Sequence, residues 1–158
     1  MVGKFAYVAC EDGSIRVLKV KKTKIELVKM LVKSSASCLS LAVASLVEAP
    51  TASNRNAHES SSDNEQEENI GPVRRLFAGY ADGTIKMWDL VTGNCELHIE
   101  KQTQKEIKKD GPTLIWRLQK VGNYLVSGDS KGALSFWDCK FGTLVASFSQ
   151  LQADILAI

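Results

Sequence analysis

Short apolar runs separated by glycine-containing turns make up most of this 158-residue chain. The segment 76–99 shows the pattern best, because it contains three such runs joined by an Asp82-Gly83 turn and by a second glycine turn at 92–94. An Asp-Gly pair supplies the positive φ that a tight hairpin requires. We therefore predict three antiparallel strands in this segment.

The pattern recurs along the chain. Trp88-Asp89 ends the middle run, the same dipeptide returns at Trp137-Asp138, 49 residues later, and the turn glycine returns at Gly132 with the same offset. Trp-Asp is the dipeptide that names the WD repeat, whose blades are four-stranded sheets around a central channel. We predict an all-β fold, a WD-repeat β-propeller, with about three blades of an incomplete ring.

A weaker copy of the repeat lies nearer the N-terminus. Asp12-Gly13 matches the Asp-Gly turn, but Leu18-Lys19 stands where the repeat would have tryptophan and aspartate. We interpret this region as a degenerate blade formed by the second, third and fourth strands of a sheet.

The pattern divides the chain into six parts. These are a degenerate blade plus the first strand of the next (1–47), an acidic serine-rich disordered insert (48–72), the rest of the second blade (73–100), a basic linker (101–112), the third blade (113–149) and the start of a further blade (150–158). Propeller repeats run about 40 to 45 residues and rings need about four to eight of them. The length therefore predicts a fragment of a longer protein or an incomplete gene model.

Charge is unevenly distributed along a chain whose formal net charge is +2. Residues 48–69 carry six acidic side chains and one arginine, a net charge of −5, which leaves +7 for the remainder. With few apolar residues, this insert cannot bury enough surface to offset its ordering entropy.

The insert also contains two candidate modification sites, because Ser60 and Ser62 each precede an acidic residue by three positions. They are candidate phosphorylation sites, although an unmodified solvated loop explains the composition at least as well.

The basic linker carries four lysines: Lys101, Lys105, Lys108 and Lys109. Lysine and arginine make many of the contacts with nucleic-acid phosphates. These lysines are therefore the candidate contacts with RNA or an acidic partner. A solvated charged face would have the same composition, so both interpretations stay open.

Cysteine usage and hydropathy bear on location. The four cysteines have no C-x-x-C spacing and lie in or beside predicted strands, at Cys10, Cys38, Cys95 and Cys139. This favours reduced, buried thiols over metal binding or disulfides. The longest apolar run, 38–47, is typical of a strand buried on both faces between neighbouring blades, although its periodicity also fits a short helix. It is far shorter than the ~18 residues of a membrane span. We expect an intracellular protein with no membrane partner.

Catalytic motifs are missing from the sequence. A nucleophilic triad needs a positioned histidine, but the two histidines are His58 in the insert and His98 in a predicted strand. Neither a phosphate loop nor a zinc or calcium motif occurs. Asp12, Asp82 and Asp129 lie near turns, where we expect them to accept hydrogen bonds. We predict a binding platform, with no enzyme activity, cofactor or small-molecule substrate.

The three tryptophans, Trp88, Trp116 and Trp137, suggest two roles. They could stack on nucleic-acid bases, or they could pack between neighbouring blades. Because they lie in predicted strands of this repeat, we favour packing between blades.

Beyond the repeat class, the chain resembles cirhin-like nucleolar WD-repeat proteins, which belong to the complex that initiates small-subunit processome assembly on pre-ribosomal RNA. The resemblance rests on ACEDGS at 9–14, Ala78-Gly79, Ile115-Trp116 after the basic linker, and Trp137-Asp138 followed by GTLV at 142–145. It implies a non-catalytic scaffold in the nucleus and nucleolus that binds other complex subunits and pre-ribosomal RNA. The alternative is a WD-repeat adaptor of another intracellular complex, such as a ubiquitin-ligase substrate receptor or a signalling scaffold.

The chain also departs from regular WD repeats. No Gly-His dipeptide precedes a blade, so the usual Asp-His-Ser/Thr-Trp hydrogen-bond network cannot form in the ordinary way. In the third blade Lys131 occupies the position that Asp82 has in the second.

Overall fold

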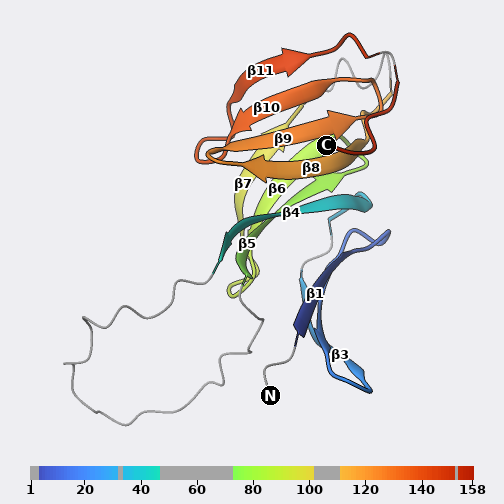
Figure 1. Cartoon of the computed structure of the whole chain (residues 1–158), viewed down its shortest axis with the longest axis vertical. Helices are drawn as coiled ribbons and strands as arrows, with labels where there is room; N and C mark the ends of the chain where they lie inside the picture. Colours follow the sequence, from blue (N-terminus) through green and yellow to red (C-terminus); the bar gives the residue numbers. More distant parts are fainter. Residues whose placement is uncertain (1–3, 32–33, 47–72, 102–110, 152) are drawn as a thin grey trace, which may run out of the picture.

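The computed structural model describes residues 4–31, 34–46, 73–101, 111–151 and 153–158. The described residues contain β-strands and turns but no helix, and the strands form three antiparallel sheets stacked one on another (Figure 1). The predicted all-β fold is therefore confirmed, with the three sheets arranged as consecutive blades of a partial β-propeller.

The first sheet has three strands and the other two have four. The first contains β1 (Lys4–Ala9), β2 (Ile15–Val20) and β3 (Ile25–Leu31). The second contains β4 (Cys38–Leu46), β5 (Val73–Tyr80), β6 (Thr84–Asp89) and β7 (Cys95–Glu100). The third contains β8 (Ile115–Val121), β9 (Tyr124–Asp129), β10 (Leu134–Asp138) and β11 (Leu144–Phe148). In each sheet the spatial order follows the chain order.

The same glycine turn occurs once in each sheet. Gly13, Gly83 and Gly132 have φ values of 78°, 82° and 72°, a backbone conformation that glycine adopts without steric cost. Each of these glycines donates its N–H to the carbonyl oxygen three residues earlier, at 3.0 to 3.3 Å. The Asp-Gly and Lys-Gly pairs of the sequence therefore mark equivalent positions in the three blades.

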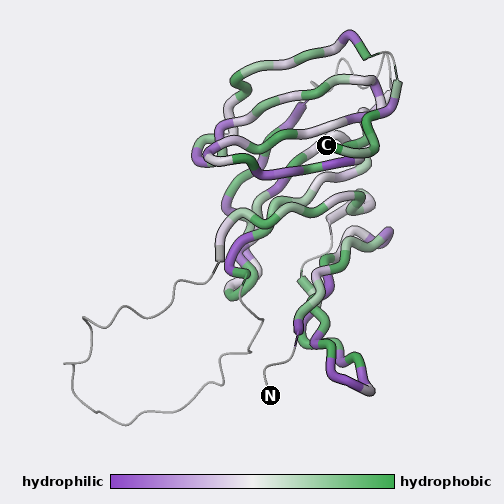
Figure 2. Tube along the Cα trace, in the orientation of Figure 1, coloured by the Kyte–Doolittle hydropathy of each residue, from purple (hydrophilic) through white to green (hydrophobic). Residues whose placement is uncertain are grey.

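Two hydrophobic cores hold the sheets together. The first, between the first and second sheets, contains Ile15, Leu31, Cys38, Val73, Leu76, Ala78, Tyr80, Trp88 and Leu90. The second, between the second and third sheets, contains Phe77, Ile85, Ile99, Ile115, Leu118, Leu125 and Trp137. Each Trp-Asp tryptophan thus packs between its own sheet and the preceding one. Figure 2 shows the contrast along the chain, since most of β4 is hydrophobic and the β2–β3 turn is hydrophilic.

Successive blades dock at equivalent glycines. A Cβ on Gly79 of β5 would collide with Ile115 of β8, and a Cβ on Gly128 of β9 would collide with Ile155. The backbone N–H of Ile155 also donates to the carbonyl oxygen of Asp129, at 3.0 Å. Ile155 therefore packs on Gly128 of the third sheet in the way that Ile115 of β8 packs on Gly79 of the second sheet.

Three local expectations are wrong. β4 is not buried on both faces, because it lies at the edge of its sheet and Val43 is 43% exposed. Trp116 is only half-buried, and its indole Nε1 donates to Asp154 Oδ2 at 3.0 Å. All four cysteines are free, but Cys95 is exposed because it begins the outer strand β7.

Candidate functional site

The Asp-Gly turns of the first two sheets have the same side-chain hydrogen bonds. Asp12 Oδ1 accepts from the amide and hydroxyl of Ser14 at 3.1 and 2.6 Å. Asp82 Oδ1 accepts from the amide and hydroxyl of Thr84 at 3.0 and 2.7 Å. The bonds from Ser14, assisted by Arg16, lower the pKa of Asp12 below its ordinary value. Both carboxylates are therefore engaged in organising a turn.

In the third sheet, the equivalent turn is held by an aspartate at another position, Asp129. Asp129 Oδ1 accepts from the backbone N–H groups of Lys131 and Ala133 at 2.8 and 2.9 Å. The Lys101 ammonium forms an ion pair with the other oxygen of Asp129 and donates to Ser135 Oγ at 3.0 Å. The carboxylate is fully buried, and the Lys101 side chain is 14% exposed. This pair links the end of β7 to the third sheet.

The structure describes one of the four linker lysines. The structure places Lys101 against Asp129, largely away from solvent. Lys105, Lys108 and Lys109 lie outside the described residues, and so do Ser60, Ser62 and the acidic insert. Their contacts with RNA or a partner, and the phosphorylation of the serines, stay predictions.

Each buried Trp-Asp indole has a hydroxyl partner. Trp88 Nε1 donates to Tyr80 Oη at 2.9 Å, and Trp137 Nε1 donates to Ser127 Oγ at 2.9 Å. Tyr80 precedes its tryptophan by eight residues, whereas Ser127 precedes its tryptophan by ten. Burial raises the pKa of Tyr80, so its hydroxyl remains protonated. These hydroxyls replace part of the network that regular WD repeats build with histidine.

The Trp-Asp aspartates hold the turn that leads to the outer strand. Asp89 Oδ1 accepts from the N–H groups of Val91 and Thr92 at 2.8 and 2.9 Å, and Asp89 Oδ2 accepts from Arg74 Nε at 2.7 Å. Asp138 Oδ1 likewise accepts from the N–H groups two and three residues on, both at 2.8 Å. Burial opposes ionisation of Asp89, but the bonds from Thr92, Val91 and Arg74 outweigh it and lower its pKa.

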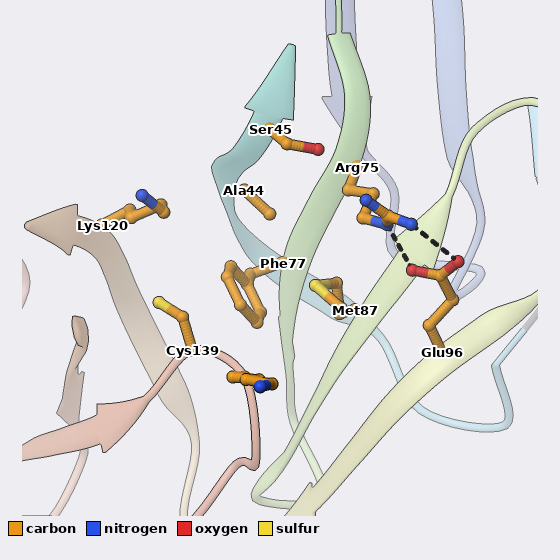
Figure 3. A pocket seen from close by; sticks show the side chains of 9 residues that line it. Ala44, Ser45, Arg75, Phe77, Met87, Glu96, Lys120 and Cys139 are labelled. Atoms are coloured by element: carbon orange, nitrogen blue, oxygen red, sulfur yellow. Dashed lines mark hydrogen bonds and ion pairs between the residues drawn. The ribbon is translucent and has the colours of Figure 1, made fainter. Parts of the chain in front are cut away.

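A shallow groove of about 410 Å³ lies between the second and third sheets (Figure 3). It is lined by Ala44, Ser45, Arg75, Phe77, Met87, Glu96, Lys120, Cys139 and Lys140. Arg75 Nε and Glu96 Oε2 form an ion pair on one side of the groove. Figure 3 shows Lys120 on the opposite side, with Phe77, Met87 and Cys139 between the two. The groove offers an apolar floor with charged walls.

Burial affects the cysteine thiols of the described residues. Burial raises the pKa of Cys139 in the groove, and that of Cys38 in the first core to about 12, so both thiols stay protonated at neutral pH. The described part of the chain contains no group of three His, Cys, Asp or Glu side chains arranged to hold a metal ion. It also has no helix long and apolar enough to cross a membrane.

Sequence reasoning missed three features of this site: the hydroxyl partners of the two indoles, the Lys101–Asp129 pair and the groove. Aligning the two Trp-Asp repeats would have placed Ser127 opposite Ala78, and Asp129 opposite Tyr80. A buried carboxylate needs a cation or several donors. The aspartate at position 129 was therefore the sequence feature that could have predicted a cation partner such as Lys101. The sequence carried no signal for the groove, because its lining comes from five strands and the turn after β10.

Comparisons with known proteins give partial matches. No family model matches the chain. U3 small nucleolar RNA-associated protein 4 of Schizosaccharomyces pombe is 40% identical to it over 84 residues, and the protein of the same name in Saccharomyces cerevisiae is 33% identical over 86 residues. Each match covers 52% of this chain but only 12% and 11% of the two relatives. The chain therefore spans a small part of the length of these relatives.

One solved structure supports the fold. The crystal structure of the computationally designed Ika4 protein matches with a TM-score of 0.59, over 95% of this chain and 69% of the designed chain. The sequences are 19% identical. At that identity the likeness concerns the fold alone.

Proposed function

We propose that this chain is a segment of a non-catalytic scaffold subunit in ribosome biogenesis. In this role it supports assembly of the small-subunit processome and processing of pre-ribosomal RNA, in the nucleus and nucleolus. The observation that carries the proposal is the 40% identity, over 84 residues, to a protein named for its association with U3 small nucleolar RNA. The finer assignment to the cirhin-like proteins rests on the sequence motifs at 9–14 and 142–145.

The fold suits a scaffold. Stacked antiparallel sheets expose turns and outer strand edges, which give several partners separate places to bind. Three of the described carboxylates, Asp12, Asp82 and Asp129, accept hydrogen bonds that organise turns. We infer that the partners are other subunits of a multiprotein complex, together with pre-ribosomal RNA, and that no cofactor or small-molecule substrate is involved.

Affinity purification of the tagged protein from cells tests this proposal. The co-purified proteins are identified by mass spectrometry and the RNA by sequencing, with and without ribonuclease treatment. We expect nucleolar proteins, U3 small nucleolar RNA and pre-ribosomal RNA to be enriched. Protein partners that survive ribonuclease would be direct contacts within the complex. A diffuse cytoplasmic protein that co-purifies with a ubiquitin ligase or a signalling complex would contradict the proposal and support the adaptor alternative.

A further inference from the structure

The groove between the second and third sheets has an apolar floor with room for a side chain. Its floor is formed by three half-buried residues, Ala44 of β4, Met87 of β6 and Cys139 after β10, with the buried ring of Phe77 of β5 beneath them. Cavities of roughly 150 Å³ lined by apolar groups hold a benzene ring, and this groove measures about 410 Å³. Because it is open to solvent, a side chain presented by another molecule can enter it.

The charges around the groove are mainly positive. Three cations, Arg75, Lys120 and Lys140, face a single carboxylate, Glu96, which pairs with Arg75. Lys120 Nζ donates to the carbonyl oxygen of Gly122 at 2.7 Å. Lys140 Nζ lies 5.0 Å from the centre of the Phe141 ring.

Within the described part of the chain, neither Lys120 nor Lys140 has a carboxylate partner. Both lysines are exposed. Two ammonium groups beside the apolar floor therefore remain available to an anionic ligand.

Ser45 provides a separate observation at the wall of the groove. Among the described residues, its Oγ is the one buried side-chain oxygen for which the structure shows no hydrogen-bond partner. Unpaired buried polar groups cost free energy and are uncommon. Because this oxygen is buried, a ligand with polar backbone atoms in the groove can pair with it after the Ser45 side chain changes rotamer.

We propose that this groove is a docking site for an acidic peptide segment of a partner protein, which inserts one apolar side chain between Lys120 and Arg75. Carboxylates that flank the apolar residue would pair with Lys120 and Lys140. The assignment follows from the combination of an apolar floor, two lysines beside it without a carboxylate partner and an unpaired hydroxyl on its wall. It does not depend on the role in ribosome biogenesis, because the groove would bind such a segment in any complex.

The groove favours a peptide over RNA. Single-stranded RNA binds through exposed aromatic rings and an extended track of cations. Phe77, the aromatic residue of the groove, is 1% exposed and presents no open face for a base. The available cations are confined to the walls of one short groove. The same features suit an apolar side chain flanked by carboxylates.

A binding assay with the 158-residue chain tests the proposal. The probe is a fluorescein-labelled peptide in which one leucine is flanked on each side by Asp-Glu, and its control carries serine in place of the leucine. Lys120→Glu and Lys140→Glu should each weaken binding by about tenfold, because like charges then face the peptide. Lys22→Glu makes the same charge change on the β2–β3 turn of the first sheet and should leave the affinity within about twofold.

Methionine methyl NMR locates the bound peptide. Met87 lines the groove, whereas Met30 lies on the exposed outer strand of the first sheet and serves as the internal control. We expect the Met87 methyl signal to shift on peptide addition and the Met30 signal to stay in place. The serine peptide should shift neither signal.

Three results would overturn the assignment. The first is an unchanged Met87 signal at saturating peptide, and the second is a uridine oligonucleotide that shifts Met87 while the peptide does not. The third is peptide binding that appears only after residues 48–69 are replaced by a neutral linker, which would assign the groove to the chain's own acidic segment. Failure of the affinity purification described above would leave the groove assay unaffected, so the two proposals fail separately.

Discussion

The second and third sheets repeat the same arrangement with different residues. In both, the tryptophan at the end of the third strand packs against the preceding sheet and donates to a hydroxyl at 2.9 Å. In the second sheet that hydroxyl belongs to Tyr80, and in the third to Ser127. The repeat therefore preserves a satisfied indole N–H rather than a particular partner.

The residue at the position of Tyr80, and the lysine beside it, differ between the two sheets. In the third sheet the equivalent residue is Asp129, which is fully buried and forms an ion pair with Lys101. A lysine also accompanies Tyr80, since Lys86 Nζ lies 5.0 Å from the centre of its ring. Lys86 comes from the same sheet, but Lys101 comes from the segment after β7. The first core is thus closed by a cation over a neutral ring and the second by a buried ion pair.

The largest expected effect tests whether the two tryptophans are equivalent. Trp88→Ala and Trp137→Ala should each lower the free energy of unfolding by ~3–5 kcal/mol, because each removes a buried aromatic side chain between two sheets. Trp116→Ala, at a half-buried position, should cost about 1 kcal/mol. Denaturant unfolding followed by circular dichroism measures all three. A Trp88→Ala variant that keeps full stability and loses only RNA binding would contradict the packing role.

The ion pair provides the sharpest distinction between the two cores. Lys101→Met should lower the free energy of unfolding by about 3 kcal/mol, because it leaves the Asp129 charge buried without its cation. Lys86→Met, the matched change in the second sheet, removes a cation over a ring together with its hydrogen bond to Ser34 Oγ, and should cost about 1–2 kcal/mol.

Denaturant unfolding of both variants measures this difference. In the double variant with Asp129→Asn, we expect part of the loss from Lys101→Met to be recovered, because no buried charge remains. Equal losses for Lys101→Met and Lys86→Met would mean that the ion pair does not distinguish the two cores.

A smaller effect is expected from removing the hydroxyl partners. Tyr80→Phe and Ser127→Ala each leave a buried indole N–H unpaired, which should cost about 1–3 kcal/mol. The near-equal bond lengths predict similar losses. Fluorescence of the three tryptophans during denaturant unfolding measures them, and Ser14→Ala in the first sheet controls for loss of a turn hydroxyl. A neutral Tyr80→Phe variant would show that the ring, and not the hydroxyl, matters at this position.

The smallest effect concerns pH. The pKa of Asp89 is lowered in the folded protein, so its ionised form stabilises the fold above the ordinary carboxyl pKa of about 4. That contribution is lost as the pH falls through the lowered pKa. Asp89→Asn should therefore make the stability less dependent on pH below about 4. Unfolding measured at a series of pH values checks this, with Glu100→Gln on the exposed edge of β7 as the control.

Much of the fold could be predicted because its signals are local. A glycine with positive φ and an Asx turn involve neighbouring residues, so the turns at Gly13, Gly83 and Gly132 could be located in the sequence. The tryptophan repeat then gave the order of the blades. Burial of β4 was predicted less well, because its exposure depends on where its sheet ends, which no pattern within the strand records.

The candidate site was harder to predict because its contacts join distant parts of the chain. Lys101 was grouped with the other linker lysines by sequence, yet its carboxylate partner lies 28 residues away in the third sheet. The Tyr80 hydroxyl was hidden because an ordinary repeat would use a serine at another position. The groove brings together β4, β5, β6, β7, the end of β8 and the turn after β10, and only the stacking of the sheets defines it.

Depletion of the protein in cells, followed by measurement of ribosomal RNA, tests the central claim most directly. We predict that mature small-subunit ribosomal RNA falls relative to large-subunit ribosomal RNA and that its unprocessed precursor accumulates. Re-expression of the protein should restore the ratio. An unchanged ratio and unchanged precursor levels, in cells from which the protein has been removed, would contradict a scaffold role in small-subunit processing.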